Sequence, residues 1–74
     1  MNFGEALEKA KRGAGMRLPR WSPEVIVWLQ RPDSGSVNTY PYLYVSSRYG
    51  RVPWVVTQVE LLSEEWEIVG EVVE

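Results

Sequence analysis

Residues 52–66 have the sequence VPWVVTQVELLSEEW. Thr57 is followed three residues later by a glutamate, and this capping box predicts a short helical turn over residues 58–62. A strand is expected over residues 66–73, because Trp66 and Ile68 alternate with Glu65, Glu67 and Val69, as is typical of a strand with one buried face. This strand is expected to end near Gly70 or shortly beyond it. The stretch therefore predicts a capped helical turn followed by the last strand of the chain.

Four earlier strands are expected, over residues 16–20, 25–30, 40–46 and 51–56. The last three are rich in β-branched and aromatic residues, and the first is disturbed at its end by Pro19. Gly50 can take a positive φ, so the last two of these strands are expected to pair as a hairpin. The segment 25–30 is too apolar to be half-solvated and is expected to be buried on both faces or to lie in an interface. In the segment 40–46 alternation places Tyr40, Tyr42 and Tyr44 on one face.

The chain begins with a helix signal. Asn2 and Glu5 form a capping box, and the residues that follow place apolar side chains on one helical face, namely Phe3, Ala6, Leu7 and Ala10. Gly13 is placed to end this helix, which is expected over residues 3–12. Together the elements predict a single small α+β domain over residues 1–74. It has an antiparallel β-sheet, one N-terminal helix packed on it, and a short helical turn before the last strand.

The composition excludes several kinds of site and cross-link. The 74 residues contain no cysteine and no histidine, so disulfides and the usual zinc and iron sites are excluded and no cofactor is expected. A domain of this size needs an unusually good core or self-association. Four tryptophans, four tyrosines and one phenylalanine exceed what a small core needs, so some of this aromatic surface is expected at an interface or in a pocket.

The net charge of -2 is unevenly distributed. Residues 1–31 carry six basic and three acidic residues, whereas residues 32–74 carry two basic and seven acidic ones. The front half of one protomer could therefore pack on the back half of another, although such splits are often ordinary solvated faces. Long nucleic acid is not an expected partner. The sequence contains neither a membrane span nor a signal-peptide pattern, so a cytoplasmic protein is expected.

Two groups of residues are candidates for ligand binding. Trp54, Thr57 and Gln58 would bring an indole face beside a hydroxyl and a carboxamide, as a planar polar ring requires. The alternative is that Trp54 belongs to the core and Thr57 is only a helix cap. Trp21 is flanked by Arg17 and Arg20, and two guanidiniums beside an indole can hold a phosphate next to a stacked base. The alternative there is an exposed strand edge.

Phe3 could cover a pocket, although its helical phase also suits the core. The sequence contains few residues that could catalyse a reaction. Glu64 and Glu65 are adjacent, so on a strand they point to opposite faces and do not readily act as an acid–base pair. Ser46 and Ser47 have no histidine to activate them. A protein that binds is therefore expected before one that catalyses, and no catalytic residue is assigned.

The opening MNFGEAL, the Arg20-Trp21 pair and the closing motif from residue 52 to residue 69 resemble the second type of phage Thoeris anti-defence protein. This resemblance implies a sponge. Proteins of that family bind the cyclic ADP-ribose isomer, of the glyco-cyclic ADP-ribose type, that triggers bacterial Thoeris defence. They sequester it without cleaving it, and some members also capture cyclic oligonucleotides.

The resemblance further implies a homotetramer with ligand pockets between protomers. By this resemblance the ligand residues of this chain would be Phe3, Trp21, Trp54, Thr57 and Gln58. Arg17 and Arg20 are added to them because their positive charges suit a phosphate group. Two other functions stay open. One is an adaptor whose aromatic patch docks on a host or phage protein, and the other is an enzyme that cleaves the same nucleotide with a carboxylate such as Glu64.

Overall fold

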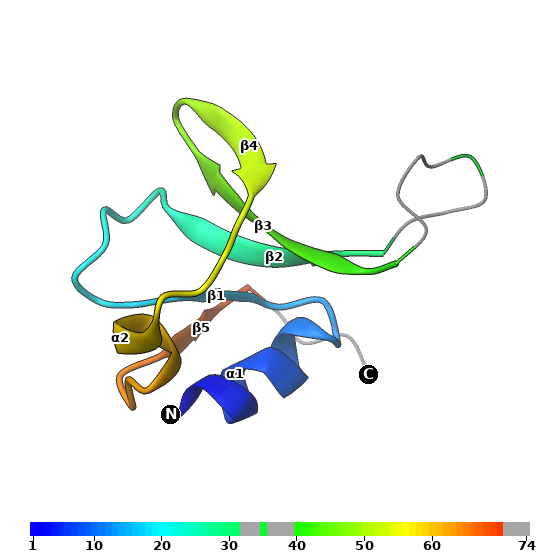
Figure 1. The fold of residues 1–74 in the computed structure, drawn as a ribbon. Helices are drawn as coiled ribbons and strands as arrows, with labels where there is room; N and C mark the ends of the chain where they lie inside the picture. The colour runs from blue at the N-terminus through cyan, green and yellow to red at the C-terminus, as the bar shows by residue number, and fades with distance from the viewer. Residues whose placement is uncertain (32–34, 36–39, 71–74) are drawn as a thin grey trace.

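The computed structural model describes residues 1–31, 35 and 40–70. Its elements in chain order are α1 (Phe3–Ala10), β1 (Gly15–Arg17), β2 (Ile26–Gln30), β3 (Tyr42–Ser47), β4 (Gly50–Pro53), α2 (Gln58–Leu61) and β5 (Glu67–Val69). The strands form one five-stranded sheet in the order β4-β3-β2-β1-β5, and every neighbouring pair is antiparallel (Figure 1). The α+β class with an N-terminal helix and a short helix before the last strand is confirmed.

Both capping boxes are present. The Asn2 side chain accepts a hydrogen bond from the Glu5 backbone N–H at 2.8 Å, and the Glu5 carboxylate accepts one from the Asn2 N–H at 3.0 Å. Thr57 and Glu60 repeat this arrangement at the start of α2. Side chains thus satisfy the N–H groups that the first turn of each helix leaves without intrahelical partners.

Most elements are shorter than the sequence predicts. α1 ends at Ala10 rather than at residue 12, because the chain then turns through Gly13 at a φ of 104°. β1 ends at Arg17, ahead of Pro19, which has no N–H for the ladder. β3 begins only at Tyr42, so Tyr40 lies outside the strand and is exposed. Residues 71–73 of the predicted last strand lie outside the described residues.

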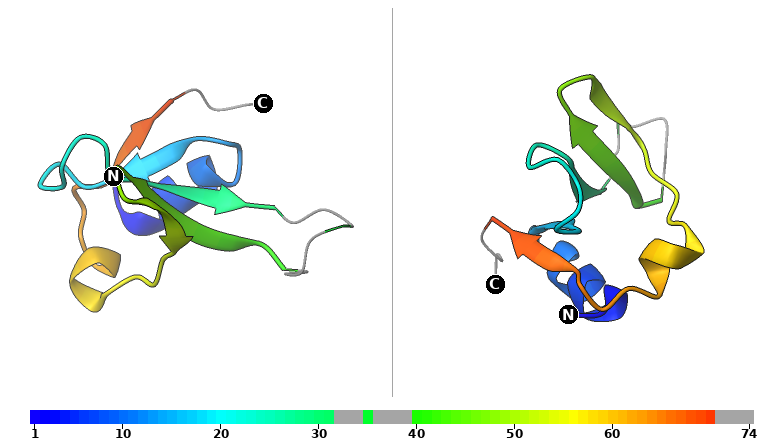
Figure 2. Two further views of the ribbon diagram at one scale, coloured as in Figure 1. Left: turned by 90° about the horizontal axis from the view of Figure 1, so that it is seen from above. Right: turned by 90° about the vertical axis from the view of Figure 1, so that its left-hand side faces the viewer.

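The two helices lie on the same side of the sheet (Figures 1 and 2). The core between the helices and the sheet consists mainly of small and aliphatic side chains. Its buried members among the described residues are Ala6, Ala10, Ala14, Met16, Leu18, Val27 and Trp66. Alternation along β2 and β3 directs Val27, Leu43 and Val45 into this core. Within residues 1–31, 35 and 40–70, no helix lies on the other face of the sheet.

β2 differs in part from the first of the two alternatives that its sequence left open, burial on both faces rather than a place in an interface. Val27 is fully buried, but Ile26 and Trp28, on the face without helices, are half-buried. Trp28 lies across the neighbouring strand, where the atoms of its six-membered ring come close to Gly15. The absence of a side chain at Gly15 is what makes room for this indole.

Replacing Gly15 with alanine is expected to lower the free energy of unfolding by about 1–3 kcal/mol, the usual cost of overpacking. The added Cβ would lie 2.6 Å from Ile26 Cγ2 and 3.1 Å from two ring atoms of Trp28, so both side chains must move. Urea denaturation followed by tryptophan fluorescence measures the loss. Gly4→Ala is the matched control, because its Cβ would meet only Asn2 Oδ1 at 3.5 Å. Equal stability of the two variants would contradict this packing.

Candidate functional site

Four aromatic rings from four distant segments meet on the helical side of the sheet. We define this aromatic cluster as Phe3, Trp21, Trp54 and Trp66. Trp66 lies at its centre, and this residue is 2% exposed. The ring centroids of Phe3 and Trp21 each lie 5.4 Å from that of Trp66, and the centroid of Trp54 lies 6.1 Å from it. All three contacts are edge-to-face, an arrangement that aromatic pairs favour.

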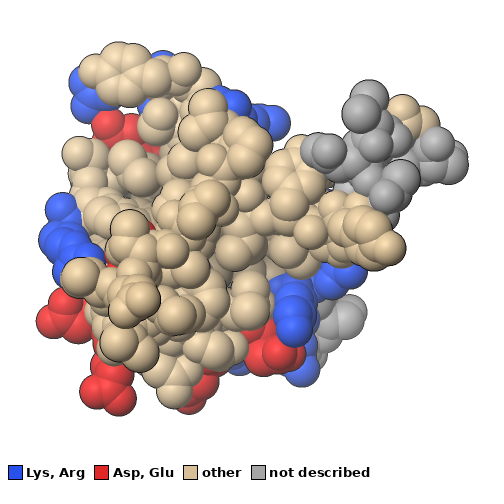
Figure 3. All heavy atoms as spheres, in the orientation of Figure 1, with Lys and Arg blue, Asp and Glu red and all other residues tan. Residues whose placement is uncertain are grey.

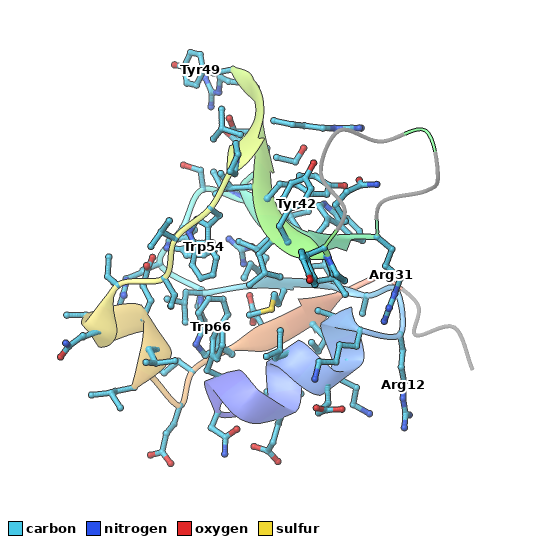
Figure 4. The ribbon with its side chains drawn as sticks, turned by 45° about the vertical axis from the view of Figure 1, so that its right-hand side comes forward. Arg12, Arg31, Tyr42, Tyr49, Trp54 and Trp66 are labelled. Carbon is cyan, nitrogen blue, oxygen red and sulfur yellow. The ribbon has the colours of Figure 1, made fainter. Side chains whose placement is uncertain are left out.

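Each ring of the aromatic cluster is held by a different element. Phe3 is the first residue of α1, and Trp21 lies in the connection between β1 and β2. Trp54 follows β4 directly, and its backbone N–H donates to Leu43 O at 3.0 Å. In Figure 4, Trp66 lies between α1 and α2, with Trp54 beside it toward the sheet. The structure thus brings together three of the predicted ligand residues, namely Phe3, Trp21 and Trp54.

The rings of the aromatic cluster pack on one another. Trp54 lies 6.4 Å from Phe3 and 6.3 Å from Trp21, measured between centroids. A planar ligand between two parallel rings needs about 7 Å, twice a contact distance of about 3.5 Å. Phe3 and Trp54 are stacked too closely to admit such a ligand, and Trp21 meets Trp54 edge-to-face at 73°, so the single chain has no slot between these rings. What remains for a ligand is the outer surface of Phe3, Trp21 and Trp54, all of which are only half-buried.

Trp66 was not among the predicted site residues. Its indole Nε1–H donates to Glu60 O at 2.8 Å, which ties α2 to the core. Its backbone N–H donates to Met1 O at 3.0 Å, and the amino group of Met1 donates to Trp66 O at 3.0 Å. The start of α1 is thereby fixed beside the start of β5. The alternation of Trp66 with Ile68 was the sequence signal for this burial.

Arg17 is held inside the protein. Its side chain is 13% exposed, and its Nη1 forms an ion pair with Glu67 at 2.6 Å. Its Nη2 donates to Trp21 O at 2.6 Å and more weakly to Ser22 O at 3.3 Å. These bonds fix the backbone that carries Trp21. The observed geometry gives Arg17 the role of a positioning residue for that indole.

Arg20 is exposed, and within the part of the chain that the structure describes its guanidinium has no hydrogen bond or ion pair. It precedes Trp21 directly. A cation on this connection is free to meet an anionic group of a ligand that rests on the indole. Of the two arginines predicted beside Trp21, Arg20 is thus the one whose charge is available.

Thr57 and Gln58 differ as Arg17 and Arg20 do: the side chain of the first is engaged within the protein, and that of the second is available to a ligand. The Thr57 hydroxyl accepts from the Glu60 N–H at 3.3 Å and donates to Glu60 Oε1 at 2.9 Å, so it is engaged at the cap of α2. The Gln58 side chain is exposed, and among residues 1–31, 35 and 40–70 its carboxamide has no partner. α2 and the connection that carries Trp21 lie at the same end of the molecule (Figures 1 and 2).

The described acidic side chains do not form a cluster. Within the described ranges there is no group of three or more carboxylate side chains that could hold a metal ion. Hydrogen bonds from Arg48 lower the pKa of the Glu24 carboxyl, at 2.9 Å from Nε and 2.7 Å from Nη2. A general acid needs a raised pKa instead, so Glu24 does not suit that role.

Among residues 1–31, 35 and 40–70, no helix is both long and apolar enough to cross a membrane.

Comparison with protein families gives one match. The model of the Thoeris anti-defense 2-like domain matches residues 1–69. The matched range contains every helix and strand described above and all seven predicted ligand residues. A search of curated proteins gave no match.

Proposed function

Because the chain belongs to the family of Thoeris anti-defense 2-like domains, we propose that it binds and sequesters a cyclic ADP-ribose-type immune signal without cleaving it. Membership of this family supports a phage anti-defence role and favours a non-catalytic one. In the proposal the protein acts in the cytosol of the infected bacterium. There it removes the signal and so inhibits Thoeris defence.

The observation that carries this proposal is the convergence of Phe3, Trp21 and Trp54 around Trp66. Outer indole surfaces suit a purine, because stacking needs a flat apolar face that stays accessible. Arg20 supplies a guanidinium, which pairs well with phosphate oxygens.

The remaining predicted residues have distinct roles in this proposal. Gln58 supplies an amide that can both donate to and accept from a base or a ribose. Arg17 positions Trp21 through its bonds to the backbone. Thr57 fixes the start of α2, and therefore the position of Gln58, through the cap.

A homo-oligomer is part of the proposal, as a tetramer with pockets between protomers. Three aliphatic side chains on one segment support it. Val55, Val59 and Leu62 are 85%, 71% and 76% exposed, respectively, although water disfavours such surface. We call these three residues the aliphatic ridge. Figure 3 shows uncharged side chains over α2 and the neighbouring part of α1, with the charged ones at the edges of the view.

The aliphatic ridge begins directly beside the aromatic cluster, because Val55 follows Trp54 in the chain, and it continues onto α2, which carries both Val59 and Gln58. A second protomer seated on the aliphatic ridge would therefore lie close to the half-buried surface of Trp54. Such a protomer could close over a ligand that a single chain leaves open to solvent. This explains why the protomer by itself has no enclosed site between its aromatic rings.

The double variant Val59→Asp and Leu62→Asp is expected to break the assembly into single chains of 8.5 kDa. Burying two carboxylates without partners costs several kcal/mol, whereas both positions tolerate charge when exposed. Light scattering during gel filtration measures the mass. Tyr49→Asp is the control, because Tyr49 is 90% exposed in the β3–β4 turn, outside the aliphatic ridge. A double variant that keeps the parent mass would show that the interface lies elsewhere.

Calorimetric titration with a cyclic ADP-ribose isomer tests the proposed function directly. We expect saturable binding, and chromatography after denaturation should return the isomer unchanged. A ring-opened product would indicate the cleaving enzyme instead. The absence of affinity for this isomer and for cyclic oligonucleotides, together with capture of a host or phage protein, would indicate the adaptor.

A further inference from the structure

The sheet face without helices has a hollow of its own. Its volume is about 110 Å³, and its lining comes from β2, β3 and β4, with the residues Gln30, Tyr42, Tyr44, Arg51, Val52 and Pro53. None of these residues belongs to the aromatic cluster or to the seven predicted ligand residues. The hollow is therefore a separate feature of the surface.

Strand alternation separates the hollow from the core. Leu43 and Val45 pack into the core, so Tyr42 and Tyr44, which alternate with them along β3, face the other way. Gln30 is the Cα partner of Tyr42 across β2 and β3, which places its side chain on the same face. Figure 4 shows Tyr42 and Trp66 on opposite sides of the sheet.

Arg51 gives the hollow a fixed positive charge. Its guanidinium carbon lies 6.0 Å from the centroid of the Tyr44 ring, within the range of a cation–π contact. Among the described residues no carboxylate pairs with it. Arg48, on the same hairpin, is instead neutralised by Glu24 at 2.7 Å. Arg51 thus lies over a ring, and no described acidic side chain compensates its charge.

Gln30 leaves one polar atom for a ligand. Its Nε2 donates to Arg31 O at 3.4 Å, which orients the carboxamide and leaves Oε1 to accept a hydrogen bond. Because Arg51 covers the Tyr44 ring, Tyr42 is the aromatic ring left for stacking. The hollow thus offers a stacking surface, a cation and an acceptor on neighbouring strands.

We propose that this hollow binds a single aromatic ring that carries an anionic substituent. The ring rests on Tyr42, the anion pairs with Arg51, and a hydroxyl or N–H on the ring donates to Gln30 Oε1. The volume sets the size, because an engineered cavity of about 150 Å³ holds one benzene. A hollow of about 110 Å³ that is open to solvent therefore suits one ring and not a stacked pair.

The test uses 4-hydroxybenzoate and 4-hydroxyphenyl phosphate as the two anionic probes and 4-hydroxybenzamide as the neutral one, each titrated into the full chain and followed by NMR. We expect the resonances of Tyr42, Tyr44 and Arg51 to shift with at least one anion, and the neutral amide to bind about tenfold more weakly or not at all. The anion that binds more tightly identifies a carboxylate or a phosphate as the natural group.

Arg51→Gln should weaken the binding of the anion about tenfold, and Tyr42→Leu should weaken it as well, while both spectra stay those of a folded chain. Arg48→Gln is the matched control on the same hairpin and should bind as the parent protein does. The proposal is overturned if the neutral amide binds equally well, if Arg51→Gln has no effect, if the shifts fall on Trp21 and Trp54 instead, or if neither anion binds at millimolar concentration.

Discussion

Replacing Trp66 with alanine is expected to remove most of the stability of this domain. Truncation of a buried tryptophan costs about 3–5 kcal/mol, and the total for a small domain is near the lower end of about 5–15 kcal/mol. Trp66 is 2% exposed and contacts the other three rings of the aromatic cluster. The variant also loses the bond from Nε1 to Glu60 O, so α2 should detach early.

Equilibrium unfolding in urea, followed by far-ultraviolet circular dichroism, measures this loss. Trp66→Phe is the control, because it keeps an aromatic ring in the cluster and removes the N–H donor and part of the volume. We expect it to cost about 1–3 kcal/mol, clearly less than alanine. A Trp66→Ala variant within about 1 kcal/mol of the parent protein would contradict the placement of this ring at the centre of the core.

Replacing Arg20 with glutamine is expected to weaken binding of the cyclic ADP-ribose isomer by about tenfold or more, the usual loss when a charge-assisted hydrogen bond to phosphate is removed. Its stability should stay within about 0.5 kcal/mol of the parent value, because the side chain is exposed and forms no hydrogen bond or ion pair with the described residues. This separation of binding from folding is not available at Trp54, whose truncation would also unpack Phe3, Trp21 and Trp66.

Calorimetry with the isomer measures the affinity, and Arg12→Gln is the matched control. Arg12 is also exposed but follows α1, well away from Trp54 (Figure 4). The loss at Arg20 should shrink as salt rises, because the pairing is electrostatic. Equal affinities for the Arg20 and Arg12 variants would remove the connection between β1 and β2 from the ligand site.

The local signals in the sequence were sufficient for the helices. Both capping boxes form with the predicted partners, since a cap depends on residues three positions apart. Alternation likewise predicted that Leu43 and Val45 face away from the tyrosines of β3. The ends of the strands were less predictable, because they depend on where each neighbouring strand stops. β4, for example, ends at Pro53, where the sequence pattern alone continued to residue 56.

The environment of each candidate residue depended on tertiary contacts. Arg17 is engaged because β1 pairs with β5 in a register that sets it opposite Glu67, fifty positions away. No local pattern contains that register. Alternation with Ile68 predicted the burial of Trp66, but its contacts with Phe3, Trp21 and Trp54 join segments far apart in the sequence. The hollow beside Tyr42 needs three strands in order, and therefore had no sequence signal.

Capture of an intact cyclic ADP-ribose-type signal is what separates the proposed function from the adaptor and from the cleaving enzyme. The most direct measurement is to incubate the purified chain with lysate from infected bacteria in which Thoeris is active, wash it, denature it by heat and identify the released small molecule by mass spectrometry. We expect release of an intact cyclic ADP-ribose isomer. Release of no nucleotide, or of a ring-opened product alone, would contradict it.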